Sequence, residues 1–170
     1  MESLKNKNIL VTGGSGFVGT NLLIKLLESE ANLFATLNNS EPLIKDERIK
    51  FLKGDLTLKE NCIKATKDID FVIMCAANTS GAKIMATTPL VHLTPNVLMN
   101  TLMLDAAYSA GVKKCLFVSS NAVYPLTDYA VKESDVTGEF FPSYHIGASM
   151  KVFTENVCEI YSTRIKNPMQ

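Results

Sequence analysis

The chain has 170 residues, of which 46% are hydrophobic, and its formal net charge at pH 7 is zero. This length suits one domain with a full core, and the apolar content excludes a disordered chain. The balanced charge favours neither a nucleic-acid partner nor a membrane surface, and we expect neither.

The start of the chain, MESLKNKN, lacks the apolar segment of a signal peptide, and no apolar run is long enough to span a bilayer. We therefore expect a cytoplasmic protein. The four cysteines form no C-x-x-C pair and are expected to be reduced, and we predict no metal site.

The first structural unit lies in residues 8–27, NILVTGGSGFVGTNLLIKLL. Apolar and β-branched residues at 9–12 predict a strand. Apolar residues at helical spacing over 17–27 predict a helix. A strand and a helix joined by a glycine turn are typical of a dinucleotide-binding unit, although such a turn can also be purely structural.

The glycines of this turn have the spacing G-x-x-G-x-x-G, at Gly13, Gly16 and Gly19. We expect Gly13 to allow the tight turn out of the strand and Gly16 to let the backbone approach a pyrophosphate. Gly19 should let the helix pack against the strand. The pyrophosphate would then lie at the N-terminus of the helix, where backbone N–H groups are free.

Residues 33–37 predict a second strand, and Asn38 follows it at the place where the adenosine ribose of a dinucleotide usually lies. An acidic residue there favours NAD and an arginine favours NADP. Asparagine can bond a ribose hydroxyl but favours neither, so both cofactors stay open.

A third strand is predicted at 49–53 and a helix at 59–67, with Asp55 between them. Asp55 could be a turn or N-cap residue, or it could contact a ligand. The continuous apolar run 71–77 predicts a strand buried on both faces of a parallel sheet. Its small last residues, Ala76 and Ala77, leave room for a ligand at the edge where doubly wound sheets bind them.

The rest of the chain predicts a polar loop at 78–88, a long helix at 89–110, a strand at 114–119, a loop at 125–143 and a helix at 144–161. Pro95 suits a first helical turn or a kink. Methionines and leucines on the long helix could face a partner or the chain's own sheet. Strands alternating with helices predict an α/β fold, a Rossmann-type doubly wound parallel sheet with helices on both faces.

Taken in order, several stretches resemble one family, the extended short-chain dehydrogenase/reductases of the NAD-dependent epimerase/dehydratase group, which acts on nucleotide sugars. The matching stretches are VTGGSGFVG at 11–19, GDL at 54–56, CAA at 75–77, NV at 96–97 with DAA at 105–107, AGVKKCLFVSSNAVY at 110–124, and Lys151 with Glu155.

The resemblance implies a set of cofactor-binding residues: Gly13, Gly16, Phe17, Val18, Gly19, Asp55, Leu56, Ala76, Ala77 and Lys151. It implies that Asn96 supports the active site and that Ser120 is the catalytic Ser/Thr, bonded to the reacting sugar oxygen. Lys151 is implied as the catalytic lysine, which holds the nicotinamide ribose. An ammonium there also makes a neighbouring tyrosine a better base.

The sequence departs from the family at that tyrosine, because the motif Tyr-x-x-x-Lys would place it where Gly147 stands. The nearest tyrosine, Tyr144, lies seven residues before Lys151, about two turns away on the same helix face. Tyr144 could serve as the base or could be an ordinary aromatic at a helix start. In the second case the chain would keep its cofactor site and be slow or inactive in the usual oxidation step.

The family also has further strands and a C-terminal substrate domain. We therefore expect residues 1–170 to be the NAD(P)-binding Rossmann domain of a larger enzyme, truncated before that domain and with one sheet edge exposed. Family members commonly dimerise through helices matching 96–109 and 144–161, which implies a homodimer here.

Three functional hypotheses follow. The first is an NAD- or NADP-dependent epimerase, dehydratase or reductase of a nucleotide sugar. The second is a dinucleotide-binding module without turnover, which Gly147 and the missing domain favour. The third and weakest is an enzyme acting on a non-sugar alcohol or ketone.

Overall fold

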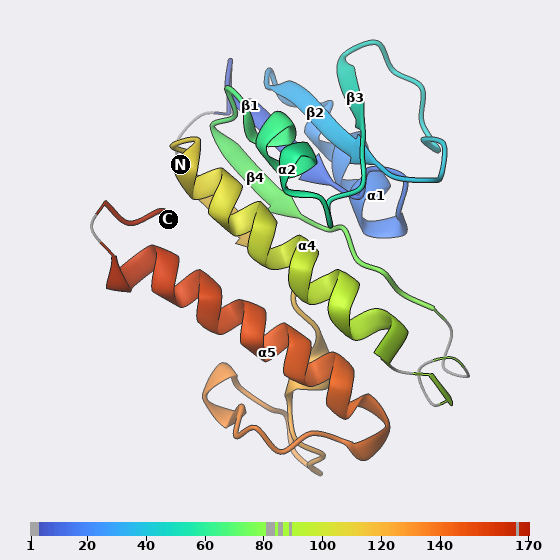
Figure 1. Ribbon diagram of the computed structural model, residues 1–170, viewed down its shortest axis with the longest axis vertical. Helices are drawn as coiled ribbons and strands as arrows, with labels where there is room; N and C mark the ends of the chain where they lie inside the picture. The colour runs from blue at the N-terminus through green and yellow to red at the C-terminus, as the bar shows by residue number, and fades with distance from the viewer. Residues whose placement is uncertain (1–3, 81–83, 85–86, 89, 166) are drawn as a thin grey trace.

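A five-stranded, all-parallel sheet forms the centre of the computed structural model, which describes residues 4–80, 84, 87–88, 90–165 and 167–170 (Figure 1). The strand order is β3-β2-β1-β4-β5. The strands are β1 (Asn8–Thr12), β2 (Asn32–Leu37), β3 (Ile49–Lys53), β4 (Phe71–Met74) and β5 (Lys114–Phe117). The predicted Rossmann-type sheet is confirmed.

Helices cover both faces of this sheet, as the sequence predicts (Figure 1). They are α1 (Phe17–Leu26), α2 (Lys59–Thr66), α4 (Leu90–Ser109) and α5 (His145–Glu159), and α5 continues into a π-helical turn, Ile160–Arg164. On one face, Ile9 and Val11 of β1 pack with α1. On the other face, Leu10 packs with α2 and α4, and α5 lies alongside α4.

The strand order reverses between β1 and β4, which pair from Ile9–Phe71 to Thr12–Met74. In doubly wound sheets, a ligand binds at the carboxyl ends of the strands where the order reverses. The hydroxyl of Thr12 accepts hydrogen bonds from the backbone N–H groups of Cys75 and Ala76, at 3.1 and 3.0 Å. This side chain therefore joins the two strands at the place where a ligand is expected.

Several element boundaries differ from the predicted ones. Strand β4 ends at Met74 rather than at residue 77, because the Thr12 hydroxyl takes the next two backbone donors. Strand β5 ends at Phe117 rather than at residue 119. Pro95 lies inside α4 and not in its first turn, because the helix begins at Leu90. The predicted loop 78–88 lies partly outside the described residues.

The end of the chain lies against the β5 edge that we expected to be exposed. The backbone N–H of Cys115 donates to the carbonyl of Gln170 at 2.6 Å, and the N–H of Gln170 donates to the carbonyl of Lys113 at 3.1 Å. Met169 is buried in the core. The first residues of this edge are therefore paired, which corrects the expectation of a fully exposed edge.

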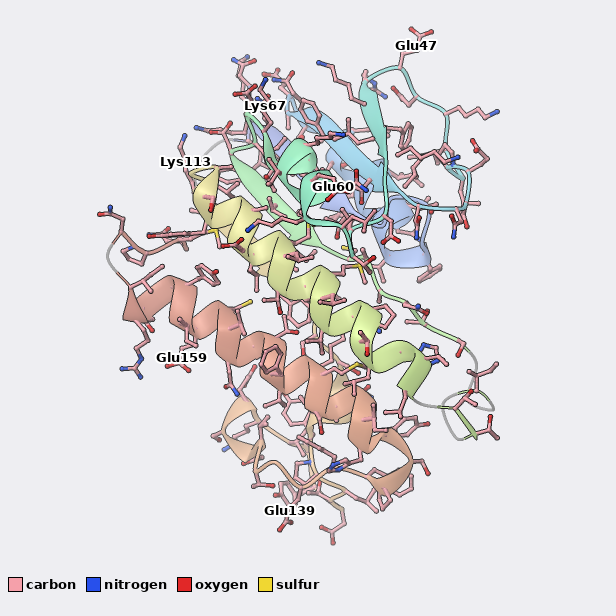
Figure 2. The ribbon with its side chains drawn as sticks, viewed as in Figure 1. Glu47, Glu60, Lys67, Lys113, Glu139 and Glu159 are labelled. Atoms are coloured by element: carbon pink, nitrogen blue, oxygen red, sulfur yellow. The ribbon has the colours of Figure 1, made fainter. Side chains whose placement is uncertain are left out.

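Charged side chains are spread over separate elements. Figure 2 shows Glu47, Lys67, Lys113, Glu139 and Glu159 pointing outward at different places around the molecule. Among the described helices, none combines the length and the apolar character needed to cross a bilayer.

Candidate functional site

The glycine turn after β1 is built by close backbone contacts. Gly13 has a φ of +72°, which side-chain-bearing residues rarely adopt. A Cβ there would also lie 2.8 Å from Cα of Ala76, at the end of β4. The predicted tight turn at Gly13 is confirmed, and it brings the turn directly against the residues that follow β4.

Gly19 and Gly14 allow neighbouring segments to pack closely against this turn. A Cβ on Gly19 would lie 2.3 Å from the carbonyl oxygen of Gly13, so the lack of a side chain lets the first turn of α1 approach the turn that directly follows β1. A Cβ on Gly14 would lie 2.7 Å from Cβ of Ala35 in β2. Sequence reasoning assigned no role to Gly14, although the Gly13-Gly14 doublet could have indicated one.

Gly16 differs from these glycines because the local fold does not demand it. Its φ of −79° and ψ of 165° suit any residue. An added Cβ would meet only the Gly13 carbonyl oxygen, at 3.3 Å, a tight contact that a shift of a few tenths of an ångström would relieve. Gly16 is the N-cap of α1 and has no side chain to cap the free N–H groups of the helix. This open space suits an approaching anion such as a pyrophosphate.

The other residues predicted to contact the cofactor differ in their exposure and in their hydrogen bonding. Phe17 is 84% exposed, and Val18 and Asn38 are exposed as well. The carboxylate of Asp55 accepts hydrogen bonds from the backbone N–H and hydroxyl of Thr57, at 2.9 and 2.8 Å. The turn interpretation of Asp55 is therefore confirmed, and its contact with a cofactor stays a prediction.

Leu56, the second residue of the predicted adenine pair, is 6% exposed and belongs to the core under α2 and α4. Its side chain is therefore occupied by packing. A contact between Leu56 and an adenine would have to use backbone atoms.

A cavity of about 790 Å³ opens between the loops after β4 and β5 and helices α4 and α5. This volume falls in the range of small-molecule sites. Six residues singled out from the sequence line it: Ala77, Asn96, Ser120, Tyr144, Gly147 and Lys151. The fold thus brings the predicted catalytic residues together although Ser120 and Lys151 are 31 positions apart in the sequence.

Lys151 is held inside this cavity by the end of β5. Its Nζ donates to the carbonyl of Val118 at 2.7 Å and lies 4.5 Å from the ring centroid of Phe117. Burial lowers the pKa of the Lys151 ammonium, while the nearby Glu155 carboxylate opposes that shift. These two contacts fix the position of the Lys151 side chain at the end of β5.

Ser120 begins a short 3₁₀ helix, Asn121–Val123, and its hydroxyl oxygen accepts from the N–H of Ala122 at 3.2 Å. The preceding residue, Ser119, donates its hydroxyl to Glu155 of α5. The loop that carries Ser120 is therefore tied to the helix that carries Lys151.

Tyr144 occupies the N-cap position of α5, and its ring centroid lies 5.9 Å from that of Phe141. It is a half-exposed aromatic at a helix start, yet it also lines the cavity. Gly147, where the family motif has tyrosine, lines the same cavity without a phenol. Both interpretations of Tyr144 therefore stay predictions.

A polar cluster in this cavity was missed by sequence reasoning, apart from Asn96. His92 is 6% exposed, and its ring nitrogens lie 2.6 Å from the Ser80 hydroxyl and 3.3 Å from Oδ1 of Asn78. Asn96 bonds the backbone N–H and carbonyl of Asn78, at 2.8 and 2.9 Å. The spacing of His92 and Asn96, one helical turn apart, was the signal that could have revealed the cluster.

Comparison with known proteins identifies a family whose matched region includes both the glycine turn and the cavity. A model described as the NAD dependent epimerase/dehydratase family matches residues 9–166. GDP-mannose 3,5-epimerase 1 of Oryza sativa subsp. indica is 29% identical over 162 residues, which cover 91% of this chain and 42% of the relative. dTDP-D-glucose 4,6-dehydratase of Mus musculus is 29% identical over 130 residues, which cover 69% of this chain and 36% of the relative.

A similar solved structure is that of MoeE5 in complex with UDP-glucuronic acid and NAD. It has a TM-score of 0.77 and 28% identity, over 92% of this chain and 50% of that chain. The chain therefore spans about half the length, or somewhat less, of the proteins that it matches.

Proposed function

Because the chain belongs to the NAD dependent epimerase/dehydratase family, we propose that it is the dinucleotide-binding part of an enzyme that acts on a nucleotide sugar. The cofactor that we propose is NAD, with NADP as the alternative that Asn38 leaves open. In this proposal residues 1–170 are one Rossmann domain, and the complete reaction belongs to a protein of the relatives' length.

The observation that carries the proposal is that the glycine turn and the cavity lie next to each other at the carboxyl edge of the sheet. The glycine turn contacts the residues after β4, since a Cβ on Gly13 would touch Ala76. The cavity with Ser120 and Lys151 begins at the next residue, Ala77. A dinucleotide whose pyrophosphate lies on α1 would thus extend toward the predicted catalytic side chains.

Each residue then has a physical role. The free N–H groups at the start of α1 would bind the pyrophosphate, and the absence of a Cβ at Gly16 would admit it. Lys151 would bond the ribose beside the nicotinamide, and Ser120 would bond the reacting hydroxyl of the sugar. The bound cofactor supplies a hydride acceptor.

The test is a calorimetric titration of the chain with NADH and, separately, with NADPH. We expect binding of NADH. In the variant Gly16→Val, Kd should rise at least about tenfold, because the added side chain occupies the space of a phosphate oxygen while the backbone conformation remains allowed.

A matched variant distinguishes this effect from general damage. Ser134→Val introduces the same side chain at an exposed position of the loop between β5 and α5, and it should leave Kd unchanged. The thermal midpoint of Gly16→Val should stay near that of the parent. If neither dinucleotide binds the folded parent chain, the proposal is wrong for this chain.

A second candidate function is a dinucleotide-binding module without turnover, and the observation that favours it is the glycine at position 147 of the cavity. The two candidates differ in one measurement, the reduction of NAD in the presence of GDP- and UDP-sugars by the protein at its natural length. Reduction that Tyr144→Phe abolishes would make Tyr144 the base. A panel of simple alcohols in the same assay tests the non-sugar alternative.

A further inference from the structure

Three polar side chains form a hydrogen-bonded row between the loop after β4 and the first turns of α4. The hydroxyl of Ser80 lies 2.6 Å from Nε2 of His92, and Nδ1 of the same ring lies 3.3 Å from Oδ1 of Asn78. Serine, imidazole and a side-chain acceptor in this order have the arrangement in which histidine activates a hydroxyl.

The position of Asn78 in this row is set by its backbone. Asn96 accepts from the backbone N–H of Asn78 through Oδ1 and donates to its carbonyl through Nδ2. Asn96 also donates to the carbonyl of His92, one turn earlier in α4, at 2.7 Å. One buried carboxamide thus ties the backbone of Asn78 to the turn of α4 that carries His92.

This arrangement decides which ring nitrogen carries the proton. With Oδ1 of Asn78 as acceptor, Nδ1 of His92 is the donor. Nε2 is then left without a hydrogen and accepts the proton of the Ser80 hydroxyl. His92 is 6% exposed, so water competes little for either nitrogen.

The row lies in the cavity already described. Ser80, His92 and Asn78 line it together with Ser120 and Lys151. Gly147 lines it too and brings no phenol. The cavity therefore contains the Ser80 hydroxyl, which is hydrogen-bonded to the His92 ring. Position 147, where the family motif has its tyrosine base, has no titratable side chain.

We propose that Ser80, with His92 behind it, takes the proton of the substrate hydroxyl in place of the missing tyrosine. This inference rests on the proposed function. With a bound nicotinamide cofactor supplying the hydride acceptor, the hydroxyl proton of the substrate would pass to Oγ of Ser80, and the proton of Ser80 would pass to Nε2 of His92. The substrate would become a carbonyl compound, and the ring of His92 would become an imidazolium whose Nδ1–H still donates to Asn78. In the reverse reduction the proton returns by the same route.

In these terms Ser80 is the catalytic residue, because it would touch the substrate hydroxyl. His92 and Asn78 are positioning residues that act through Ser80. A purely structural cluster would have the same ring form, because Oδ1 of Asn78 accepts from Nδ1 in either case. Turnover distinguishes the two roles, since a cluster that only holds the loop on α4 would leave kcat unchanged when Ser80 loses its hydroxyl.

The first test is a ¹H–¹⁵N correlation spectrum of the ring nitrogens in the ¹⁵N-labelled chain, which has only two histidines. We expect the neutral ring of His92 to carry its proton on Nδ1, and Asn78→Ala to shift it toward the Nε2–H form. The exposed His145 is the reference within the same molecule. A ring of His92 protonated on Nε2 in the parent chain would overturn the proposal.

The second test is turnover by the protein at its natural length. Ser80→Ala and His92→Gln should each lower kcat about 100-fold with little change in KM, as is usual for loss of a general base. Ser80→Thr keeps the hydroxyl and should retain most of kcat, and His145→Gln is the matched control. If Ser80→Ala keeps the parent kcat, the proposal is wrong.

The two proposals fail in different experiments. Absence of NADH binding would remove the proposed function, whatever the form of His92. Tight NADH binding with His92 protonated on Nε2 would leave the proposed function in place and remove Ser80 as the proton acceptor.

Discussion

Lys151 is the predicted catalytic side chain whose charge is most affected by the fold. Its ammonium is partly buried between the Val118 carbonyl and the Phe117 ring. Burial lowers its pKa below the ordinary value of 10.5, with Glu155 opposing. A lysine with a lowered pKa gives up its proton more readily and stabilises a neighbouring phenolate or alkoxide as long as it stays charged.

This shift predicts how stability depends on pH. Below the folded-state pKa of Lys151 both states bind the proton, and the burial penalty is fully present. Between that pKa and 10.5 the unfolded chain binds more protons, so the contribution of Lys151 to the free energy of unfolding rises with pH. We therefore expect the parent chain to gain stability relative to Lys151→Met as pH rises from 8 toward 10.5.

Urea denaturation of both proteins at several pH values checks this prediction. The comparison cancels the titration of the other groups that the two proteins share. Lys64→Met, at an exposed position of α2, is the matched control. A difference between parent and Lys151→Met that stays constant or falls over this range would contradict the prediction.

At the scale of elements, the junction of β1 and β4 depends on one hydroxyl. Thr12 is 1% exposed, and its Oγ1 accepts from two successive N–H groups, of Cys75 and Ala76. These donors lie where β4 has stopped pairing with its neighbour strands. The hydroxyl therefore satisfies backbone groups at the edge of the proposed cofactor site and sets the position of Ala76.

We predict that Thr12→Val lowers the free energy of unfolding by about 2 kcal/mol or more, because the isosteric side chain leaves two backbone donors without their acceptor. Thr12→Ser keeps the hydroxyl and loses one methyl group, so it should cost about 1 kcal/mol. Urea denaturation gives both values. A valine variant as stable as the serine variant would show that the two hydrogen bonds contribute little.

At the scale of the whole molecule, α4 and α5 lie side by side on the same face of the sheet (Figure 1). Their mutual contact includes a buried hydrogen bond from Asn100 to Thr154, at 3.2 Å. Beyond that contact, Leu98 of α4 is 44% exposed, Phe153 of α5 is 45% exposed, and Ile160 of the π-helical turn after α5 is 49% exposed. We propose that these residues form the homodimer interface that the resemblance implies, with a second copy of the chain as the partner.

Multi-angle light scattering tests this interface. We expect the parent chain to have the mass of a dimer and the double variant Leu98→Glu/Phe153→Glu to be a monomer, because burying two carboxylates in an apolar contact is costly. Ile24→Glu changes a residue of similar exposure on α1, which covers the other face of the sheet, and should remain dimeric. A monomeric parent chain, or dissociation by Ile24→Glu as well, would contradict the assignment.

Much of this architecture could be predicted because the relevant signals are local. The first strand and its helix have the expected positions within one residue, since apolar spacing along a short segment determines which face of an element is buried. The glycine at position 13 could be assigned to a tight turn for a similar reason, because its positive φ is a property of the residue itself.

The sequence by itself thus determined the doubly wound parallel fold, the family and the residues to examine at the carboxyl edge of the sheet. Only the tertiary structure decided the surroundings of those residues. The early end of β4 depends on Thr12, 63 residues away along the chain, and the row of Ser80, His92 and Asn78 depends on a loop meeting a helix. Periodicity places His92 on a buried helix face without distinguishing a packed ring from one bonded to two partners, because hydrogen bonds between distant segments exist only after the chain has folded.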